Sequence, residues 1–284
     1  MHKSIFLKAN DYVGDPIIEY NKITKLLSRN LYYHYSFYTM MDNNFKICKS
    51  LRNRFIDLDD CLSKSVPFLI TYKNNGKLIN VPECHRNDVF DNFLTFSEII
   101  FTMFLALAEY DKTNHIYNDY HFDKDLLQQG IEMINFSLKS LNYKINIINQ
   151  KEFNVEAIKI DEIAEMVAAQ SEPTIKSAIL HYLGARDNDI KEKENRLHQL
   201  IDLLETSFDK YKNDNTVKDV KEYIQMVRHP EIYKTKKEYD WFFKDKKEYL
   251  VRLFSLCVYI QQFAISKETL KEFKQLKKDC FGEN

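Results

Sequence analysis

The sequence predicts a mainly α-helical protein, built of helical bundles with one small β-hairpin insertion. Its 284 residues include only five glycines and five prolines, the residues that most often mark turns and irregular loops. Apolar residues recur at helical spacing, and hydrophobic residues make up 44% of the chain, so a folded core is expected rather than disorder. An all-β or doubly wound fold would need more glycine and proline.

The first domain is expected to span residues 1–152, as helices interrupted by a β-hairpin. In "PFLITYKNNGKLINV", two β-prone runs flank Asn75-Gly76, which is a strong hairpin signal. The hairpin is therefore predicted near residues 68–81. The apolar stretch "IIFTMFLALA" from Ile99 to Ala108 is far shorter than the roughly 20 residues of a membrane span and predicts a buried helix. A second extended segment is expected at Tyr143–Gln150.

The second domain, residues 153–284, is expected to be wholly helical. Its apolar stripes follow the helical period; they comprise Ile160, Ile163, Ala164 and Val167, and later Leu197, Leu200, Ile201 and Leu204. Between these stripes, "SEPTIKSAILHYLGARD" offers Ser171 as an N-cap and Gly184 as a left-handed terminator. Pro230 should end the helix "VKEYIQMVRH", and the last long helix should begin near Tyr239. The segment "KETLKEFKQLKKDC" is expected to be a solvated tail.

The cysteines and the N-terminal segment indicate a cytoplasmic protein with no membrane partner. The five cysteines are odd in number, scattered, and never form a CxxC pair, which argues against a disulfide framework and a zinc ribbon. The opening "MHKSIFLKAND" has too short an apolar run, and no small-residue cleavage site, to be a secretory signal.

Several common enzyme classes lack their signatures here. The sequence contains no GxxxxGK[ST], GxGxxG, GxSxG or HExxH pattern, which are typical of nucleotide hydrolysis, dinucleotide binding, serine hydrolysis and zinc proteolysis. The segment "HIYNDYHFDKD", with His115 and His121, has ligand types for a divalent metal, but such a polar run more often forms a solvated loop. We therefore assign no metal and no cofactor.

Two basic runs are candidates for RNA binding. From Lys22 to Arg54 the chain has seven lysines and arginines against one acid, interleaved with tyrosines, and from Lys210 to Arg252 it has twelve against eight acids. Cations neutralise phosphates, and aromatic rings stack on bases. The predicted RNA-binding residues are Asn30, Arg52, Arg54, Arg186, Lys236 and Lys237. The alternative is a solvated helix face over an aromatic core.

A short motif near the N-terminus carries the first family resemblance. Residues 29–34 read Arg-Asn-Leu-Tyr-Tyr-His, which resembles the Arg-polar-x3-His motif of HEPN ribonucleases. The resemblance implies a helical bundle that dimerises around an RNA phosphate. In metal-free RNA cleavage, His34 would move a proton near neutral pH, and Arg29 would stabilise charge on the phosphate. The alternative is that the tyrosines point into a core and His34 lies at its polar edge.

A second, more diffuse resemblance covers about 90 residues, from Glu172 to Phe263. The order "IKSAILHYLGARDNDIKEKENRLHQLIDLLE", then "MVRHPEIYKTKKEYDWFF", then "LVRLFSLCVYIQQF" is similar to the C-terminal HEPN-like domains of bacterial abortive-infection proteins. Arg228 and His229 would be its catalytic pair, but they are adjacent, unlike the spaced pair of the nuclease motif. The alternative is a helix C-terminus, where cations favour the last carbonyls.

These resemblances imply two functional hypotheses. The first is a phage-defence or toxin-type protein that binds and cleaves RNA without metal, as a homodimer, with an antitoxin or defence partner. The second is a non-catalytic HEPN-like scaffold that binds a partner protein or a nucleotide, because a bundle that lacks the spaced pair keeps its binding surface.

Overall fold

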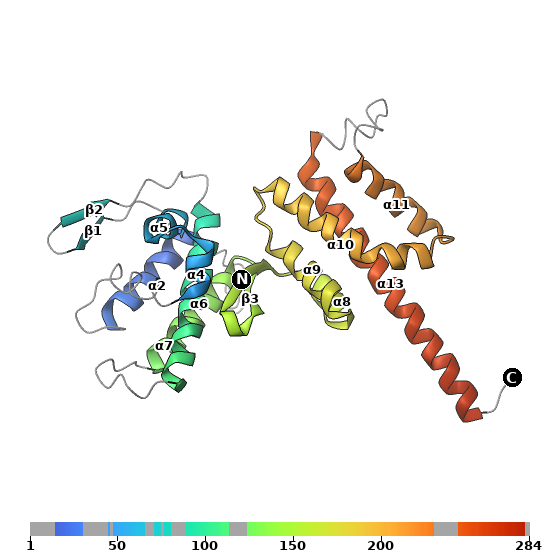
Figure 1. Cartoon of the computed structure of the whole chain (residues 1–284), viewed down its shortest axis with the longest axis horizontal. Helices are drawn as coiled ribbons and strands as arrows, with labels where there is room; N and C mark the ends of the chain where they lie inside the picture. Colours follow the sequence, from blue (N-terminus) through green and yellow to red (C-terminus); the bar gives the residue numbers. More distant parts are fainter. Residues whose placement is uncertain are drawn as a thin grey trace, which may run out of the picture. The chain divides into compact units, whose positions relative to one another are not determined.

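The computed structural model is mainly helical, as predicted, and it divides into two compact units, Met1–Lys159 and Ile160–Asn284 (Figure 1). It describes residues 15–30, 45, 48–65, 71–74, 77–80, 89–113, 124–229 and 244–281. The sequence placed the division at residue 152, whereas the structure keeps one more β-strand with the first unit.

The first unit is built around one long buried helix, α6 (Val89–Thr113), with α7 (Lys124–Ser140) beside it. Three shorter helices complete its helical part: α2 (Pro16–Asn30), α4 (Lys49–Arg54) and α5 (Leu58–Ser65). The predicted buried stretch from Ile99 lies within α6, and Ile99 and Ile100 are fully buried. Tyr20 of α2 packs against Phe96 of α6, with ring centroids 4.6 Å apart.

The predicted hairpin is present, and a second antiparallel pair accompanies it. Strands β1 (Thr71–Asn74) and β2 (Lys77–Asn80) pair with each other. Strand β3 (Tyr143–Asn149) pairs with β4 (Asn154–Lys159) across the short 3₁₀ helix η2 (Gln150–Glu152). The sequence indicated β3 as an extended segment, but it did not indicate β4.

Strand β4 forms because its alternate residues reach the core of the first unit. Val155 and Ala157 are 3% and 0% exposed, and the N–H of Ala157 donates to Oε1 of Glu98, 2.8 Å away on α6. Glu98 is only 1% exposed and also receives the guanidinium of Arg54 from α4. One buried carboxylate therefore joins three elements, which leaves it well satisfied.

Gly130 lets α7 approach α6 closely. A Cβ atom built on this buried glycine would lie 2.8 Å from Cζ of Phe104, whose side chain is only 2% exposed. Close packing of this kind leaves no room for an added methyl group unless the ring moves.

We predict that Gly130→Ala lowers the free energy of unfolding by about 1 kcal/mol, because overpacking costs about 1–3 kcal/mol and the better helix propensity of alanine returns part of it. Urea unfolding measures this change. Gln129→Ala, at an exposed neighbouring position of α7, is the matched control and should not destabilise. A Gly130→Ala protein as stable as the control would contradict the close approach.

The second unit is a helical bundle. It contains α8 (Glu162–Gln170), α9 (Pro173–Gly184), α10 (Ile190–Lys210), α11 (Asn215–Arg228) and α13 (Lys246–Phe281). Aspartate N-caps begin three of the helices: Asp161 accepts from the N–H of Ala164, Asp189 from that of Glu192, and Asp214 from that of Thr216. Such caps satisfy amides that would lack a helical partner.

Several local predictions for this unit were wrong. Helix α8 begins at Glu162, and its Ile163 is 62% exposed; the buried stripe is Ala164, Val167 and Ala168. Ser171 ends α8 instead of capping α9, because its hydroxyl donates to the carbonyl of Val167. Gly184 is the last helical residue of α9, and the following Ala185 is extended rather than left-handed.

Helix α13 is the long apolar helix of the second unit. The side chains facing the other helices are buried, among them Leu250, Phe254 and Cys257, and burial raises the pKa of the Cys257 thiol to about 12. Among the described residues, α13 is also the one helix that is long and apolar enough to cross a membrane, but half of its most apolar 18-residue segment is buried inside the fold. Core helices of soluble proteins meet the same criteria.

Candidate functional site

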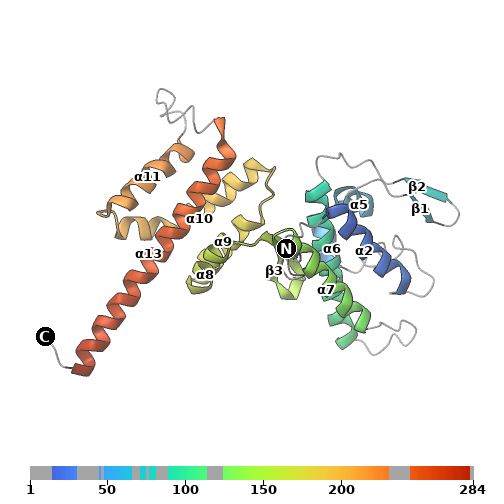
Figure 2. The ribbon, with the colours of Figure 1, turned by 180° about the vertical axis from the view of Figure 1, so that it is seen from behind.

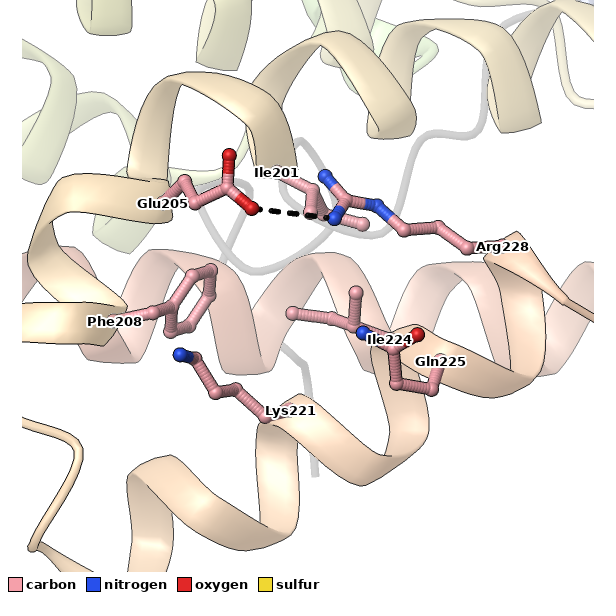
Figure 3. A pocket seen from close by; sticks show the side chains of 7 residues that line it. All are labelled: Ile201, Glu205, Phe208, Lys221, Ile224, Gln225 and Arg228. Carbon is pink, nitrogen blue, oxygen red and sulfur yellow. Dashed lines mark ion pairs between the residues drawn. The ribbon is translucent and has the colours of Figure 1, made fainter.

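A small pocket opens between α10 and α11 of the second unit (Figure 3). Its volume is about 90 Å³, and its lining includes the predicted residue Arg228. The apolar part of the lining is Ile201 and Phe208 from α10 and Ile224 from α11, each at most 3% exposed. The polar part is Glu205, Lys221, Gln225 and Arg228.

The pocket exists because two apolar stripes face each other across a short turn. Helix α10 buries Leu197, Leu200 and Leu204 beside the pocket residues, and α11 buries Val217, Val220 and Val227. The turn between the helices is fixed by Asp214, whose N–H donates to the carbonyl of Tyr211 and whose side chain caps α11. The buried side chains of α10 and α11 therefore pack against each other along most of the length of the two helices.

Acidic side chains hold the two cations at the rim. Arg228 forms an ion pair with Asp202, and its Nη1 lies 3.6 Å from Oε1 of Glu205 (Figure 3). Lys221 lies 2.6 Å from Oδ1 of Asp209, and the hydrogen bond from this lysine holds the pKa of Asp209 below its usual value. The rim is thus a set of ion pairs rather than a basic patch.

His229 stands beside Arg228 but in a different environment. It ends α11, where its N–H donates to the carbonyl of Gln225 at 2.8 Å, and its side chain is exposed. The Arg228 side chain is only 23% exposed. The cation of Arg228, in the last turn of α11, interacts favourably with the helix dipole.

His198 is a polar residue of the second unit that the sequence did not indicate as a site residue. It lies on α10, one helical turn from Asp202, and its Nε2 is buried with no hydrogen-bond partner among the described residues. Sequence carries no signal for this feature, because a histidine in an amphipathic helix is usually satisfied.

The predicted N-terminal site lies mostly outside the described residues. Arg29 and Asn30 form the end of α2, but the description does not extend to their side chains, and His34 lies outside it. The same holds for Lys236 and Lys237 and for the metal-ligand candidates His115 and His121. Within the described ranges, no group of three metal-binding side chains occurs.

The remaining predicted RNA-binding arginines are scattered. Arg52 is exposed on α4, and Arg54 is engaged by the buried Glu98. Arg186 is partly buried in the connection between α9 and α10. There, its neighbour Asp187 lies 2.5 Å from Nζ of Lys193, a lysine that is only 5% exposed. Arg228 and His229 are neighbours only because they are consecutive in the sequence, whereas Arg54 and Arg186 belong to different units.

No protein-family model matches the chain, and no curated protein or solved structure matches it either.

Proposed function

We propose that the protein is a non-catalytic helical scaffold of the HEPN-like type, and that its second unit binds a partner protein at the pocket between α10 and α11. The observation that carries this proposal is the character of the pocket: an apolar floor surrounded by charged side chains that already form ion pairs. A fixed charged rim around an apolar centre is typical of a protein interface.

The size of the pocket favours a protein over a nucleotide as its ligand. Sites for small molecules and cofactors usually have volumes of about 300–1,000 Å³, whereas this pocket has about 90 Å³. That volume suits one apolar side chain of a partner, held against Phe208 and Ile224. The rim would then supply hydrogen bonds and charge complementarity around it, chiefly from Gln225 and Glu205.

The charges also favour a protein partner over RNA. Five cations of the predicted basic run form ion pairs: Lys210 with Glu268, Lys221 with Asp209, Arg228 with Asp202, Lys246 with Glu194, and Arg252 with Glu248. RNA phosphates would have to displace these carboxylates and would approach them at close range. That cost removes much of the attraction that drives phosphate binding.

RNA cleavage without metal is the second candidate, and one observation favours it. His229 is exposed beside Arg228, so an imidazole and a guanidinium lie on consecutive residues, the two groups that proton transfer and charge stabilisation require. RNA would have to displace Asp202 from Arg228 to use the guanidinium. In that case the protein would be a cytoplasmic defence or toxin-type ribonuclease controlled by an antitoxin or another partner.

Photo-crosslinking tests the proposed scaffold directly. A benzoylphenylalanine at Gln225, which lines the pocket, should form a discrete protein adduct in the native host, and ribonuclease treatment should not remove it. The same group at Asp219, an exposed position on the opposite side of α11, is the matched control and should form none. Lys221→Glu, which reverses one rim charge, should lower the adduct yield severalfold. Adducts that disappear with ribonuclease, or equal adducts at both positions, would contradict the proposal.

A further inference from the structure

Helix α13 continues well past the bundle that its first half completes. Ala264 is its last buried residue, and the segment from Ser266 to Cys280 is exposed apart from the partly covered Glu268. This segment, which we call the α13 extension, is about 22 Å long at 1.5 Å per residue; Figures 1 and 2 show it leading to the C-terminus. Most helical stability in proteins comes from the packing of an apolar face, and this exposed segment has little such packing, so a partner would stabilise it.

Phe273, Leu276 and Cys280 of the α13 extension follow a heptad pattern, and Leu270, which is 50% exposed, lies beside it at a flanking e position. Phe273 and Leu276 are 66% and 56% exposed, and Cys280 is exposed as well. Their spacing of three and then four residues matches positions a, d and a of a heptad abcdefg. One heptad earlier the same positions hold Ser266 and Thr269, whose small side chains permit close approach of a second helix.

The a and d positions of the α13 extension form an apolar seam, and charges of opposite sign lie on its two sides. With Phe273 at position a, the flanking g positions hold Glu272 and Asp279, and the flanking e position after Leu276 holds Lys277. The face opposite the seam carries lysines: Lys267, Lys271, Lys274 and Lys278. A solvated lysine face behind an apolar seam is typical of a helix in a two-stranded coiled coil.

We propose that the α13 extension pairs with the same segment of a second copy of the chain, as a parallel, in-register coiled coil. In a parallel pair, position g of one helix lies near position e of the next heptad in the other. Glu272 would then face Lys277 of the second copy twice, by symmetry. In an antiparallel pair, g faces g, so Glu272 and Asp279 would meet acids. The charges thus favour a second copy of the chain as the partner and a parallel orientation of the two helices. This inference does not depend on the proposed function.

The oligomeric state of the full chain gives the first test. Light scattering coupled to size-exclusion chromatography should show a dimer that dissociates on dilution, and Phe273→Glu should make the protein monomeric at every concentration. Lys278→Glu, a charge reversal on the face opposite the seam, is the matched control and should remain dimeric. Both positions are exposed, so circular dichroism should show an unchanged fold. A wild-type monomer, or a dimer that survives Phe273→Glu, would overturn the proposal.

A charge swap tests the direction of the helices. Glu272→Lys and Lys277→Glu should each weaken the dimer about fivefold to tenfold, because like charges then face each other in two symmetric places. The double variant should recover wild-type affinity. Failure of the double variant to recover would overturn the parallel arrangement.

Cys280 gives an independent readout of the same register. Of the cysteines that the structure describes, only Cys280 is exposed, and a parallel pairing brings two copies of it to the same level. Diamide, which accepts the two electrons and two protons released by two thiols, should then form a disulfide-linked dimer in wild type. Cys280→Ser should abolish this product, and Phe273→Glu should reduce it strongly. A wild-type protein in which diamide forms no disulfide-linked dimer would contradict the register.

Discussion

Replacing Arg54 by methionine is expected to lower the free energy of unfolding of the first unit by about 2 kcal/mol. The reason is that Glu98, which is 1% exposed, would keep its charge in the core without its cation. Removing one partner of a buried ion pair costs about 3–5 kcal/mol, and the partial exposure of Arg54 moves the estimate below that range. Urea unfolding measures the loss, and hydrogen exchange should localise it to α6 and β4.

A second substitution, at Glu98, shows whether the loss of stability comes from the unpaired charge or from the missing side-chain contacts. Glu98→Gln removes the carboxylate but keeps an oxygen that accepts from the N–H of Ala157. In the Arg54→Met background it should therefore restore most of the lost stability. Lys49→Met, at an exposed position on the same helix, is the matched control and should change stability by less than about 0.5 kcal/mol. If Arg54→Met behaved like this control, Arg54 would be available for RNA, and the structural role assigned to it would be wrong.

The largest expected effect is that of Phe254→Ala in the second unit, at about 3–5 kcal/mol. Phe254 is 3% exposed, and its ring stacks on that of Tyr182 with centroids 4.0 Å apart and an interplanar angle of 14°. Truncation leaves a cavity between α9 and α13 and removes the stacked pair. Thermal unfolding followed by calorimetry should show the loss.

Tyr182→Phe is the matched control for this cavity, because it keeps the ring stack. Burial raises the pKa of Tyr182, and its hydroxyl has no hydrogen-bond partner among the described residues. Removing that hydroxyl should therefore be neutral or slightly stabilising. A loss as large as that of Phe254→Ala would show that the hydroxyl, rather than the stack, holds the two helices together.

Fold class and the first hairpin could be predicted from the sequence because both depend on local signals. Scarce glycine and proline, helical periodicity and an Asn-Gly pair are all read within a few residues. Strand β4 was missed because its alternation runs directly into the apolar stripe of α8, and only contact with α6 makes it a strand. The α13 extension was predicted as a tail because it is highly charged, although lysine and glutamate are good helix formers.

The candidate site was predictable only in part. The sequence drew attention to Arg228 and His229 as an adjacent pair, but it carried no information on the acids that meet Arg228. Asp202 lies 26 residues away, on the preceding helix, and Glu98 lies 44 residues from Arg54. Contacts of this kind depend on how the helices pack against each other. No local pattern in a single sequence shows this packing.

The proposal that this protein is a binding scaffold rather than a ribonuclease is tested most directly by incubating the purified protein with labelled single-stranded RNA in EDTA at low salt. We predict no cleavage, and binding no stronger than that of a general polyanion, in wild type and in the variants His34→Ala and His229→Ala alike. Metal-independent cleavage that is lost in either variant, while circular dichroism shows an intact fold, would contradict the account and assign the activity to that histidine.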